Sequence, residues 1–296
     1  MRRLRAWGPG LLLILPSLIA LAVFVYGFLG WNLRVSVSSW RGLLPAHDFV
    51  GLANYRALFD DVRFMQYDVP NIALFTLVFV AGSLALGFFM ALLLDRGVVG
   101  ESAFRAVYLF PMAISFIATA IIWRWLLDNG SGESTTGLNK LLAGAGLDVH
   151  SDWFKSDSRW AITAIALPAG WALSGYVMSL FLAGMRGVPE ELREAARVDG
   201  ASEPRVFWHV VRPMLLPVVM SALVILAHIS LKTFDLFYAM DQKNIKIDTP
   251  ALYMWFTTFD GGFYARGAAI AALLLAGVAT VIVPYIWYAV RAEHRR

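Results

Sequence analysis

"EELREAARVDGASEPRVFWHVVRP", residues 190–213, is dense in charged side chains, although long apolar segments precede and follow it. Pro189 suits the first position of a helix, because the N–H that proline lacks has no partner there. Glutamates then precede arginines, an order that matches the helix dipole. Gly200 can adopt the left-handed conformation that ends a helix, and Ser202 can cap a new one. The segment therefore predicts a short helix, a sharp turn and a second helix that continues into the next apolar segment.

The composition of the chain indicates that lipid is its solvent. Of its 296 residues, 59% are hydrophobic and only 16% are charged, whereas soluble domains carry about 25% charged residues. A membrane span needs about 20 largely apolar residues, and in lipid such a segment must be helical because its backbone finds no other hydrogen-bond partners. Six segments are long enough: 10–32, 71–94, 104–127, 160–184, 209–231 and 268–290. We predict an all-α membrane protein with six transmembrane helices in a single domain, residues 1–296, with its core at about 71–290.

The distribution of basic residues predicts the orientation of these spans. If the N-terminus is cytoplasmic, the inside segments hold 13 arginines, while the outside segments hold 11 lysines and arginines over about twice the length. This pattern satisfies the positive-inside rule and requires no nucleic acid to explain the arginines. The N-terminal apolar run exceeds the roughly 7–15 residues of a signal-peptide core, so it predicts an uncleaved first span. We expect a multi-pass protein of the cell membrane with both termini in the cytoplasm.

Several kinds of chemistry are excluded by what the chain lacks. It contains no cysteine, which rules out a thiolate metal site. It contains no Gly-Lys dipeptide, which rules out a P-loop for ATP. His228 has no second histidine near it at a spacing suited to a metal. We therefore predict no bound metal and no cofactor.

The charged segment also resembles the signature loop of the ABC-importer permeases. In that loop Glu-Ala-Ala is followed by three residues, a glycine, nine residues and an Ile-x-Leu-Pro-like end. The matching positions are Glu194, Ala195, Ala196, Gly200, Val210 and Pro213. Arg212 departs from the pattern, because the family prefers leucine there. The stretch "LAGMRGVPEELREAARVDGAS" resembles the carbohydrate branch, related to the maltose-transporter permeases, and "DFVGLANYRALF", "RAVYLFPMAIS" and "ISLKTFDLFYAM" extend the resemblance over most of the chain.

This resemblance implies that residues 189–204 form a coupling helix, which docks into a cleft on a cytoplasmic ATPase and transmits closure of the ATPase dimer to the spans. The docking residues it implies are Pro189, Glu194, Ala195, Ala196, Asp199 and Gly200. The implied partners are a second permease subunit in a heterodimer, the ATPase dimer, an extracytoplasmic solute-binding protein and a sugar. The residues alone leave open an amphipathic helix on the bilayer, although so short and acidic a segment would bind anionic lipid poorly.

Polar and aromatic residues in the fourth and fifth spans are candidates for contact with a solute, because polar groups within a membrane are costly to retain. The candidates are Trp171, Ser174, Tyr176, His228, Ser230 and Asp235. The resemblance places a sugar-contacting aromatic ring at Tyr176 and a polar contact near Ser230. Two alternatives stay open: Ser174 with its neighbouring glycine can form a helix-packing site, and Asp235 can form a helical ion pair with Lys232.

The substrate class rests on the resemblance. "LAHISLKTFDLFYAM" resembles glucose/mannose-type permeases, which implies a monosaccharide, with maltose, trehalose and glycerol phosphate as alternatives. "MDQKNIKIDTP" stands where many carbohydrate permeases carry a Thr-x-Gly-Gly-Pro-like turn, which leaves open how the loop at 241–267 meets the solute-binding protein. An ion-coupled secondary transporter would need buried acids and internal repeats, and a membrane-embedded enzyme would need clustered carboxylates or histidines at the membrane face. The sequence shows neither pattern, so we predict a transport subunit without catalytic residues.

Overall fold

The computed structural model describes residues 13–128, 130, 135–147, 151–156, 158 and 160–293. Within this part of the chain there is no β-strand, only one isolated antiparallel bridge between Ser38 and Phe49. The all-α prediction is therefore confirmed. The residues cluster in two compact units, Met1–Asp61 with Tyr253–Leu275 and Val62–Leu252 with Ala276–Arg296. The single domain expected over residues 1–296 stays a prediction.

The smaller unit is built from helices at both ends of the chain. Its elements are η1 (Ala22–Gly27), α2 (Phe28–Ser36), α3 (Ala53–Phe59), η8 (Phe256–Asp260) and the first part of α14 (Tyr264–Glu293). The side chain of Asn32 donates a hydrogen bond to the carbonyl oxygen of Ala268 at 3.1 Å, which joins α2 to α14. Asn54 donates to the carbonyl oxygens of Ser36 and Ser38, both at 2.9 Å. These bonds fix the short helix α3 against the end of α2.

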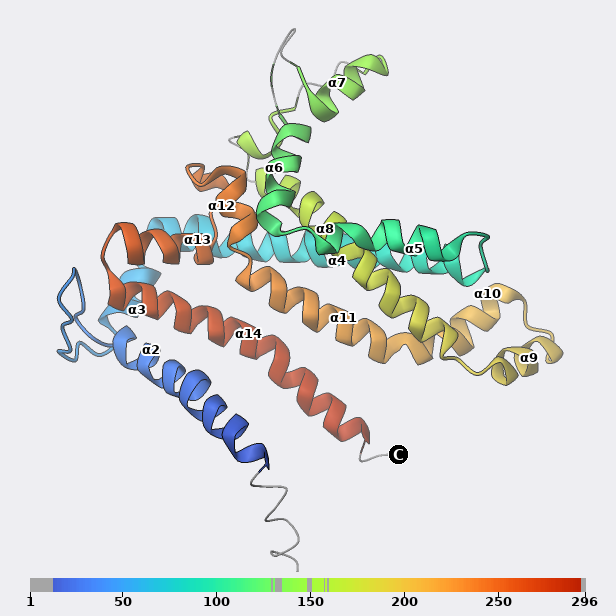
Figure 1. Ribbon diagram of the computed structural model, residues 1–296, viewed down its shortest axis with the longest axis horizontal. Helices are drawn as coiled ribbons and strands as arrows, with labels where there is room; N and C mark the ends of the chain where they lie inside the picture. The colour runs from blue at the N-terminus through green and yellow to red at the C-terminus, as the bar shows by residue number, and fades with distance from the viewer. Residues whose placement is uncertain are drawn as a thin grey trace, which may run out of the picture. The chain divides into compact units, whose positions relative to one another are not determined.

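The larger unit holds most of the helices (Figure 1). Its elements are η2 (Phe64–Asp68), α4 (Val69–Asp95), α5 (Glu101–Leu109), η3 (Phe110–Ala113), α6 (Phe116–Leu126), α7 (Gly137–Gly144), η5 (Trp153–Lys155), α8 (Ala161–Arg186), α9 (Glu190–Val198), α10 (Glu203–Val206), η6 (Phe207–Val211), α11 (Arg212–Lys232), α12 (Asp235–Asp241) and η7 (Ile245–Ile247). A further helix, α13 (Pro250–Trp255), contributes residues to both units. Helices α10, η6 and α11 run on without a break, as the sequence predicts for the segment after Ser202.

The core of the larger unit lies where α4 packs against α8. Buried residues recur every fourth position along α4 from Asn71 to Ala91, which places them on one face of the helix. Gly87 lies on this face, and a Cβ added there would come within 2.6 Å of Cγ1 of Val177. Only glycine permits this approach, so the backbones of the two helices lie close together. Helix α8 is covered over most of its length, with 67% of its most apolar stretch buried.

Five helices in the described part of the chain are long and apolar enough to cross a membrane. They are Leu13–Ser36, Phe64–Asp95, Ala161–Arg186, Glu203–Lys232 and Tyr264–Trp287. They correspond to five of the six predicted spans, with ends that differ by a few residues. Residues 10–12 of the first predicted span, and the basic residues before them, lie outside the described residues.

The third predicted span is not one straight helix, and the continuous helix expected over 104–127 is wrong. The helical segments Glu101–Ala113 and Phe116–Leu126 meet at an angle of 99°, and Figure 1 shows α5 and α6 running in different directions. Pro111 lies in the 3₁₀ turn η3 before the bend. Oγ of Ser115 accepts a hydrogen bond from the backbone N–H of Ala118 at 3.2 Å and caps α6. Counted as one broken span, the pair brings the total to the predicted six.

A buried ion pair joins distant parts of the larger unit. Nε and Nη2 of Arg63, just before η2, each lie 2.5 Å from Oδ2 of Asp248, just after η7. The side chain of Asn71 donates hydrogen bonds to the carbonyl oxygens of Lys246, at 3.0 Å, and Asp248, at 2.9 Å. Burial raises the pKa of Asp248, and the charge of Arg63 opposes that effect. The loop after α12 is therefore held to the start of the second span by charge and by hydrogen bonds.

Candidate functional site

The charged segment folds as the sequence predicts, into a helix, a turn and a second helix. Helix α9 begins at Glu190 and Pro189 is its N-cap, one position earlier than expected. Gly200 has a φ of 81°, the left-handed conformation that favours glycine. The backbone N–H of Ala201 donates to the carbonyl oxygen of Ala196 at 2.9 Å across this turn. Ser202 is the N-cap of α10, although its side chain makes no capping hydrogen bond.

The surface of α9 is open to solvent. Of the six predicted docking residues, Ala196 is half-buried, and the others are exposed: Pro189, Glu194, Ala195, Asp199 and Gly200. No residue of α9 is buried. Two large apolar side chains on α9 also face solvent, since Leu192 is 45% exposed and Val198 is 87% exposed. A short helix that shows apolar, small and charged side chains together is suited to contact another protein surface.

Arg197 forms ion pairs with two glutamates around the turn, whereas Glu194, near the middle of α9, forms no ion pair among the described residues. Nη1 of Arg197 lies 2.8 Å from Oε1 of Glu190, and its Nε lies 2.8 Å from Oε1 of Glu203. These three residues, called here the Arg197 clamp, span the turn between α9 and α10. Hydrogen bonds from Arg197 to the carboxylates of Glu203 and Glu190 raise the pKa of Arg197, so its guanidinium group keeps its positive charge. Within the described residues Glu194 has no ion pair, so its carboxylate is available to a partner.

A polar pocket lies at the other end of α11, where that helix stops. Its volume is about 390 Å³, and its lining residues are Phe116, His228, Ile229, Lys232, Thr233, Phe234 and Asp235. Nε2 of His228 lies 3.5 Å from Nζ of Lys232. Nδ1 of His228 is shielded from solvent and has no hydrogen-bond partner in the described part of the chain. Such a nitrogen is costly to bury without a hydrogen-bond partner.

This pocket brings together two of the predicted solute contacts, His228 and Asp235, and adds residues that the sequence analysis missed. Helix α11 ends at Lys232 and α12 starts at Asp235, so the two charges do not share one helix. The described residues show no ion pair between them, which removes the predicted helical pair as an explanation. Phe116 reaches the pocket because the third span breaks before it, and the apolar length of residues 104–127 does not predict that break.

The other predicted contacts lie between helices or on α8. Oγ of Ser174 accepts a hydrogen bond from the Tyr108 hydroxyl at 3.0 Å and is 1% exposed. Oγ of Ser230 lies 2.9 Å from Oγ1 of Thr76 and is fully buried. Both serines therefore join neighbouring helices. For Ser174 this agrees with the alternative that it belongs to a helix-packing site. Trp171 and Tyr176 are half-buried on α8, and the Trp171 ring lies edge-on to that of Trp123, 6.1 Å between centroids.

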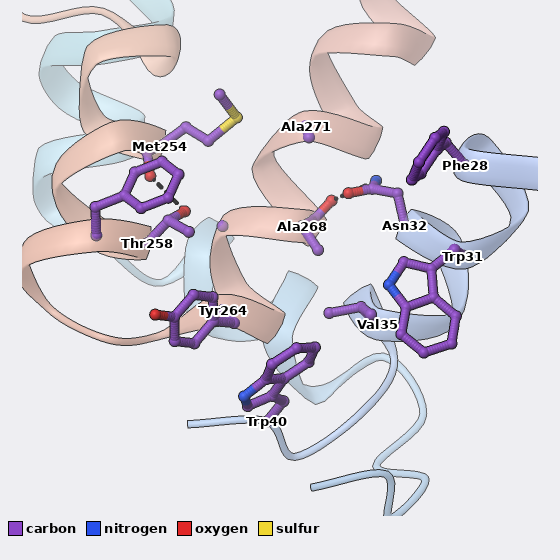
Figure 2. Close-up of a pocket in the computed structure, with 12 residues that line it drawn as sticks. Phe28, Trp31, Asn32, Val35, Trp40, Met254, Thr258, Tyr264, Ala268 and Ala271 are labelled. Atoms are coloured by element: carbon purple, nitrogen blue, oxygen red, sulfur yellow. Dashed lines mark hydrogen bonds between the residues drawn. The ribbon is translucent and has the colours of Figure 1, made fainter. Parts of the chain in front are cut away.

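A second pocket, of about 430 Å³, lies in the smaller unit between α2, η8 and α14. Figure 2 shows its walls, which are largely aromatic and aliphatic and include Trp31, Trp40 and Tyr264. The dashed lines in Figure 2 show that two of its polar side chains are bonded within the protein, because Asn32 donates to the carbonyl oxygen of Ala268 and Oγ1 of Thr258 donates to the carbonyl oxygen of Met254. This pocket therefore offers a polar solute less than the pocket beside His228 does.

Residues 83–291 match the family of binding-protein-dependent transport system inner membrane components. A probable ABC transporter permease protein of Pyrococcus horikoshii is 39% identical over 287 residues, which cover 96% of this chain and 97% of that protein. The xylose/arabinose import permease protein XacH of Haloferax volcanii is 34% identical over 274 residues, or 91% of this chain and 84% of that protein.

Among solved structures, a chain of a bacterial ABC transporter involved in the import of the acidic polysaccharide alginate superposes with a TM-score of 0.80. The superposition covers 98% of this chain and 99% of that chain, at 19% sequence identity. At this identity the likeness shows the fold alone, which is that of an ABC transporter permease.

Proposed function

The chain belongs to the family of binding-protein-dependent transport system inner membrane components, and we propose that it is the permease subunit of an ATP-driven sugar importer. It works with a second permease subunit, two copies of an ATPase and an extracytoplasmic solute-binding protein. Both of its termini lie in the cytoplasm. ATP hydrolysis comes from the separate ATPase, because this chain contains no P-loop.

The observation that carries the proposal is the exposed helix α9. Glu194 and Ala195 are open to solvent, Glu194 has no ion pair among the described residues, and the left-handed Gly200 closes the helix behind them. In this proposal α9 is the coupling helix. It seats in a cleft of the ATPase, with Glu194, Ala196 and Gly200 at the centre of the contact and Pro189 and Asp199 at its ends. Closure of the ATPase dimer moves α9 and so moves the spans.

Substituting Glu194→Lys tests the docking contact. The variant should enter the membrane normally but lose the ATPase during purification of the complex, because a lysine meets a surface that accepts a carboxylate. Asp60→Lys makes the same charge change at an exposed residue of the smaller unit and should keep the ATPase. Equal recovery of ATPase with both variants would remove Glu194 from the contact.

The pocket beside His228 is the proposed solute contact within this subunit. Asp235 and His228 supply polar side chains, and the rings of Phe116 and Phe234 supply flat apolar faces for a sugar. Trp171 and Tyr176 on α8, together with Ser174 and Ser230, are proposed to line the path in other states of the transport cycle. The solute is a monosaccharide such as glucose or mannose, and the pentose importer among the relatives adds xylose and arabinose as a second candidate.

The substrate is identified by solute-stimulated ATPase activity in the complex reconstituted with its binding protein. Glucose, mannose, xylose, arabinose, maltose, trehalose and glycerol phosphate are compared, and we expect stimulation by one of the hexoses. Stimulation by a pentose alone would replace the hexose assignment. No stimulation by any of the seven would leave the importer architecture standing but discard this solute assignment, and the search would move to other solutes.

The pocket is tested with His228→Leu and with its matched control His209→Leu. His209 lies at the other end of the same continuous helix, where its Nδ1 contacts the carbonyl oxygen of Arg205 at 2.9 Å. His228→Leu should lower transport about tenfold, the size of one lost hydrogen bond to a polar solute, with unchanged recovery of the ATPase. Tyr176→Ala should lower transport in the same assay. Identical transport by the two histidine variants would exclude His228 from the solute path.

A further inference from the structure

One arginine of α9 points away from the exposed face and toward the spans. The side chain of Arg193 is only 16% exposed, although the neighbouring Glu194 is open to solvent. Successive residues of a helix are about 100° apart around its axis, so the two side chains leave α9 in different directions. Helix α9 thus has one face available to a partner and another face, carrying Arg193, turned to its own chain.

The guanidinium group of Arg193 contacts two spans at once. Nη2 donates a hydrogen bond to the carbonyl oxygen of Met185 at 2.6 Å, in the last turn of α8. Nη1 lies 3.5 Å from Oδ2 of Asp95, the last residue of α4. Nε lies 3.8 Å from Oε2 of Glu190, in the first turn of α9 itself. A single rigid side chain therefore links α4, α8 and α9.

Helices α4 and α8 pack closely in the larger unit, where Gly87 lies against Val177. When Arg193 transmits a displacement of α9 to the ends of α4 and α8, the packing between these two helices changes. Arginine suits this role, because its planar fork holds several donors in fixed directions, whereas lysine offers one flexible ammonium group.

The other arginine of α9 provides a natural comparison. Arg197 makes two shorter ion pairs, both at 2.8 Å, but its partners Glu190 and Glu203 lie on α9 and α10. Among the described residues, the ion pairs of Arg197 reach neither α4 nor α8. If charge on α9 were all that mattered, the two arginines would be equivalent.

We propose that Arg193 is the positioning residue that transmits movement of α9 to α4 and α8, through the Met185 carbonyl and the Asp95 carboxylate. This inference rests on the proposed function, in which α9 docks on the ATPase. It adds a specific route by which the docked helix moves the membrane spans. Arg193 itself touches neither the ATPase nor the solute in this route.

The test is Arg193→Met, with Arg197→Met as its matched control, in the complete complex with ATPase and binding protein. Recovery of the ATPase, basal hydrolysis and solute-stimulated hydrolysis are measured for each variant with the transported sugar. We expect Arg193→Met to keep the ATPase and its basal rate and to lose stimulation about tenfold, the size of one lost charge-assisted hydrogen bond. Arg197→Met should keep the stimulation.

Two further variants separate transmission from stability. Asp95→Asn should lose part of the stimulation, and adding it to Arg193→Met should cause little further loss, because both act through one contact. Arg193→Lys keeps the charge beside Asp95 without the fork and should restore an intermediate level. If Arg193→Met fails to fold, Arg193→Lys takes its place in the same assay.

Retained stimulation in Arg193→Met, with the ATPase bound, would overturn the inference and leave docking by α9 intact. Loss of the ATPase in Arg193→Met would overturn it as well, since Arg193 would then belong to the docking face. Loss of stimulation to the same extent in Arg197→Met would show that charge on α9, and not the route through Arg193, is responsible. Failure of docking itself is seen separately, as retention of the ATPase by Glu194→Lys.

Discussion

The larger unit contains two arginine–carboxylate clusters that are built in opposite ways. The Arg63–Asp248 pair joins residues 185 positions apart, and its carboxylate side chain is 1% exposed. The Arg197 clamp joins residues six and seven positions apart, and its three side chains are 40% to 72% exposed. The first cluster closes a long loop through the interior. The second fixes a local turn on the surface.

The comparison teaches that an ion pair's burial and sequence separation decide what it contributes. Removing the cation from a buried pair leaves a charge that solvent cannot reach, and the cost is large. An exposed pair competes with water and with the entropy of its own side chains, so it contributes little to stability. We infer that the Arg63–Asp248 pair holds the fold, whereas the Arg197 clamp shapes a surface that works only when a partner is present.

The largest effect on stability is expected from Arg63→Met. The variant should lose about 3 kcal/mol of unfolding free energy at neutral pH, because Asp248 is left buried without its cation. Chemical unfolding of the purified protein in detergent measures the loss. Arg56→Met removes an exposed arginine from the smaller unit and should have no measurable effect.

The same variant should also show a characteristic pH dependence. Burial raises the pKa of Asp248, so the folded protein favours the neutral carboxyl group, and the stability from that preference is lost as pH rises through the raised pKa. Removing Arg63 strengthens this effect, because the nearby positive charge is gone. The difference from the wild type should therefore shrink as pH falls. A difference that stays constant with pH would show that lost packing, and not charge, causes the change.

A smaller effect is expected from Gly200→Ala, which tests what shapes the surface around the Arg197 clamp. A side chain at this left-handed position costs about 1 kcal/mol, although a Cβ there would meet nothing within 4 Å. Gly82→Ala is the matched control, because Gly82 has an ordinary helical φ and equally open surroundings. The same unfolding experiment should show a loss for Gly200→Ala and none for Gly82→Ala. Equal behaviour would mean that the turn does not depend on its glycine.

The smallest effect on stability is expected from Arg197→Met. Its two ion pairs are exposed and local, so the unfolding curve should coincide with that of the wild type. A loss comparable with that of Arg63→Met would abolish the distinction between the two clusters.

Most of the fold follows from the sequence because apolar length and helix-ending signals are local properties. Five spans, the α9 turn at Gly200 and the helix after Ser202 were predicted in this way. The bend in the third span was not, although Pro111 lies beside it, because prolines also occur in straight membrane helices. Just before the bend, α5 lies close against α8, because a Cβ added to Gly175 of α8 would lie 2.5 Å from the carbonyl oxygen of Tyr108. Such a contact depends on the packing of two helices and leaves no local pattern.

The candidate sites show the same division. The exposure of Glu194 and its neighbours agrees with the reading of the charged segment, since charge density alone indicates a surface. The solute candidates were less well predicted, because the sequence does not say which face of a helix a polar residue occupies. Ser174 and Ser230 lie in helix contacts, whereas His228 and Asp235 share a pocket that forms only because α11 stops at Lys232. Thr233 and Phe234 carry no strong signal for that stop.

The first span packs little against the rest of the described chain. Within the described residues the helix Leu13–Ser36 has 24 residues, and none of its most apolar stretch is buried within the protein. Its length corresponds to about 36 Å, which exceeds the roughly 30 Å of hydrocarbon in a typical bilayer. Near its C-terminal end, the side chain of Asn32 donates to the carbonyl oxygen of Ala268, so that end is fixed to α14, whereas the described residues before it are largely exposed. A span longer than the hydrocarbon thickness is accommodated by tilting, by kinking or by local thickening of the bilayer, and the packing contact at Asn32 helps to set its tilt.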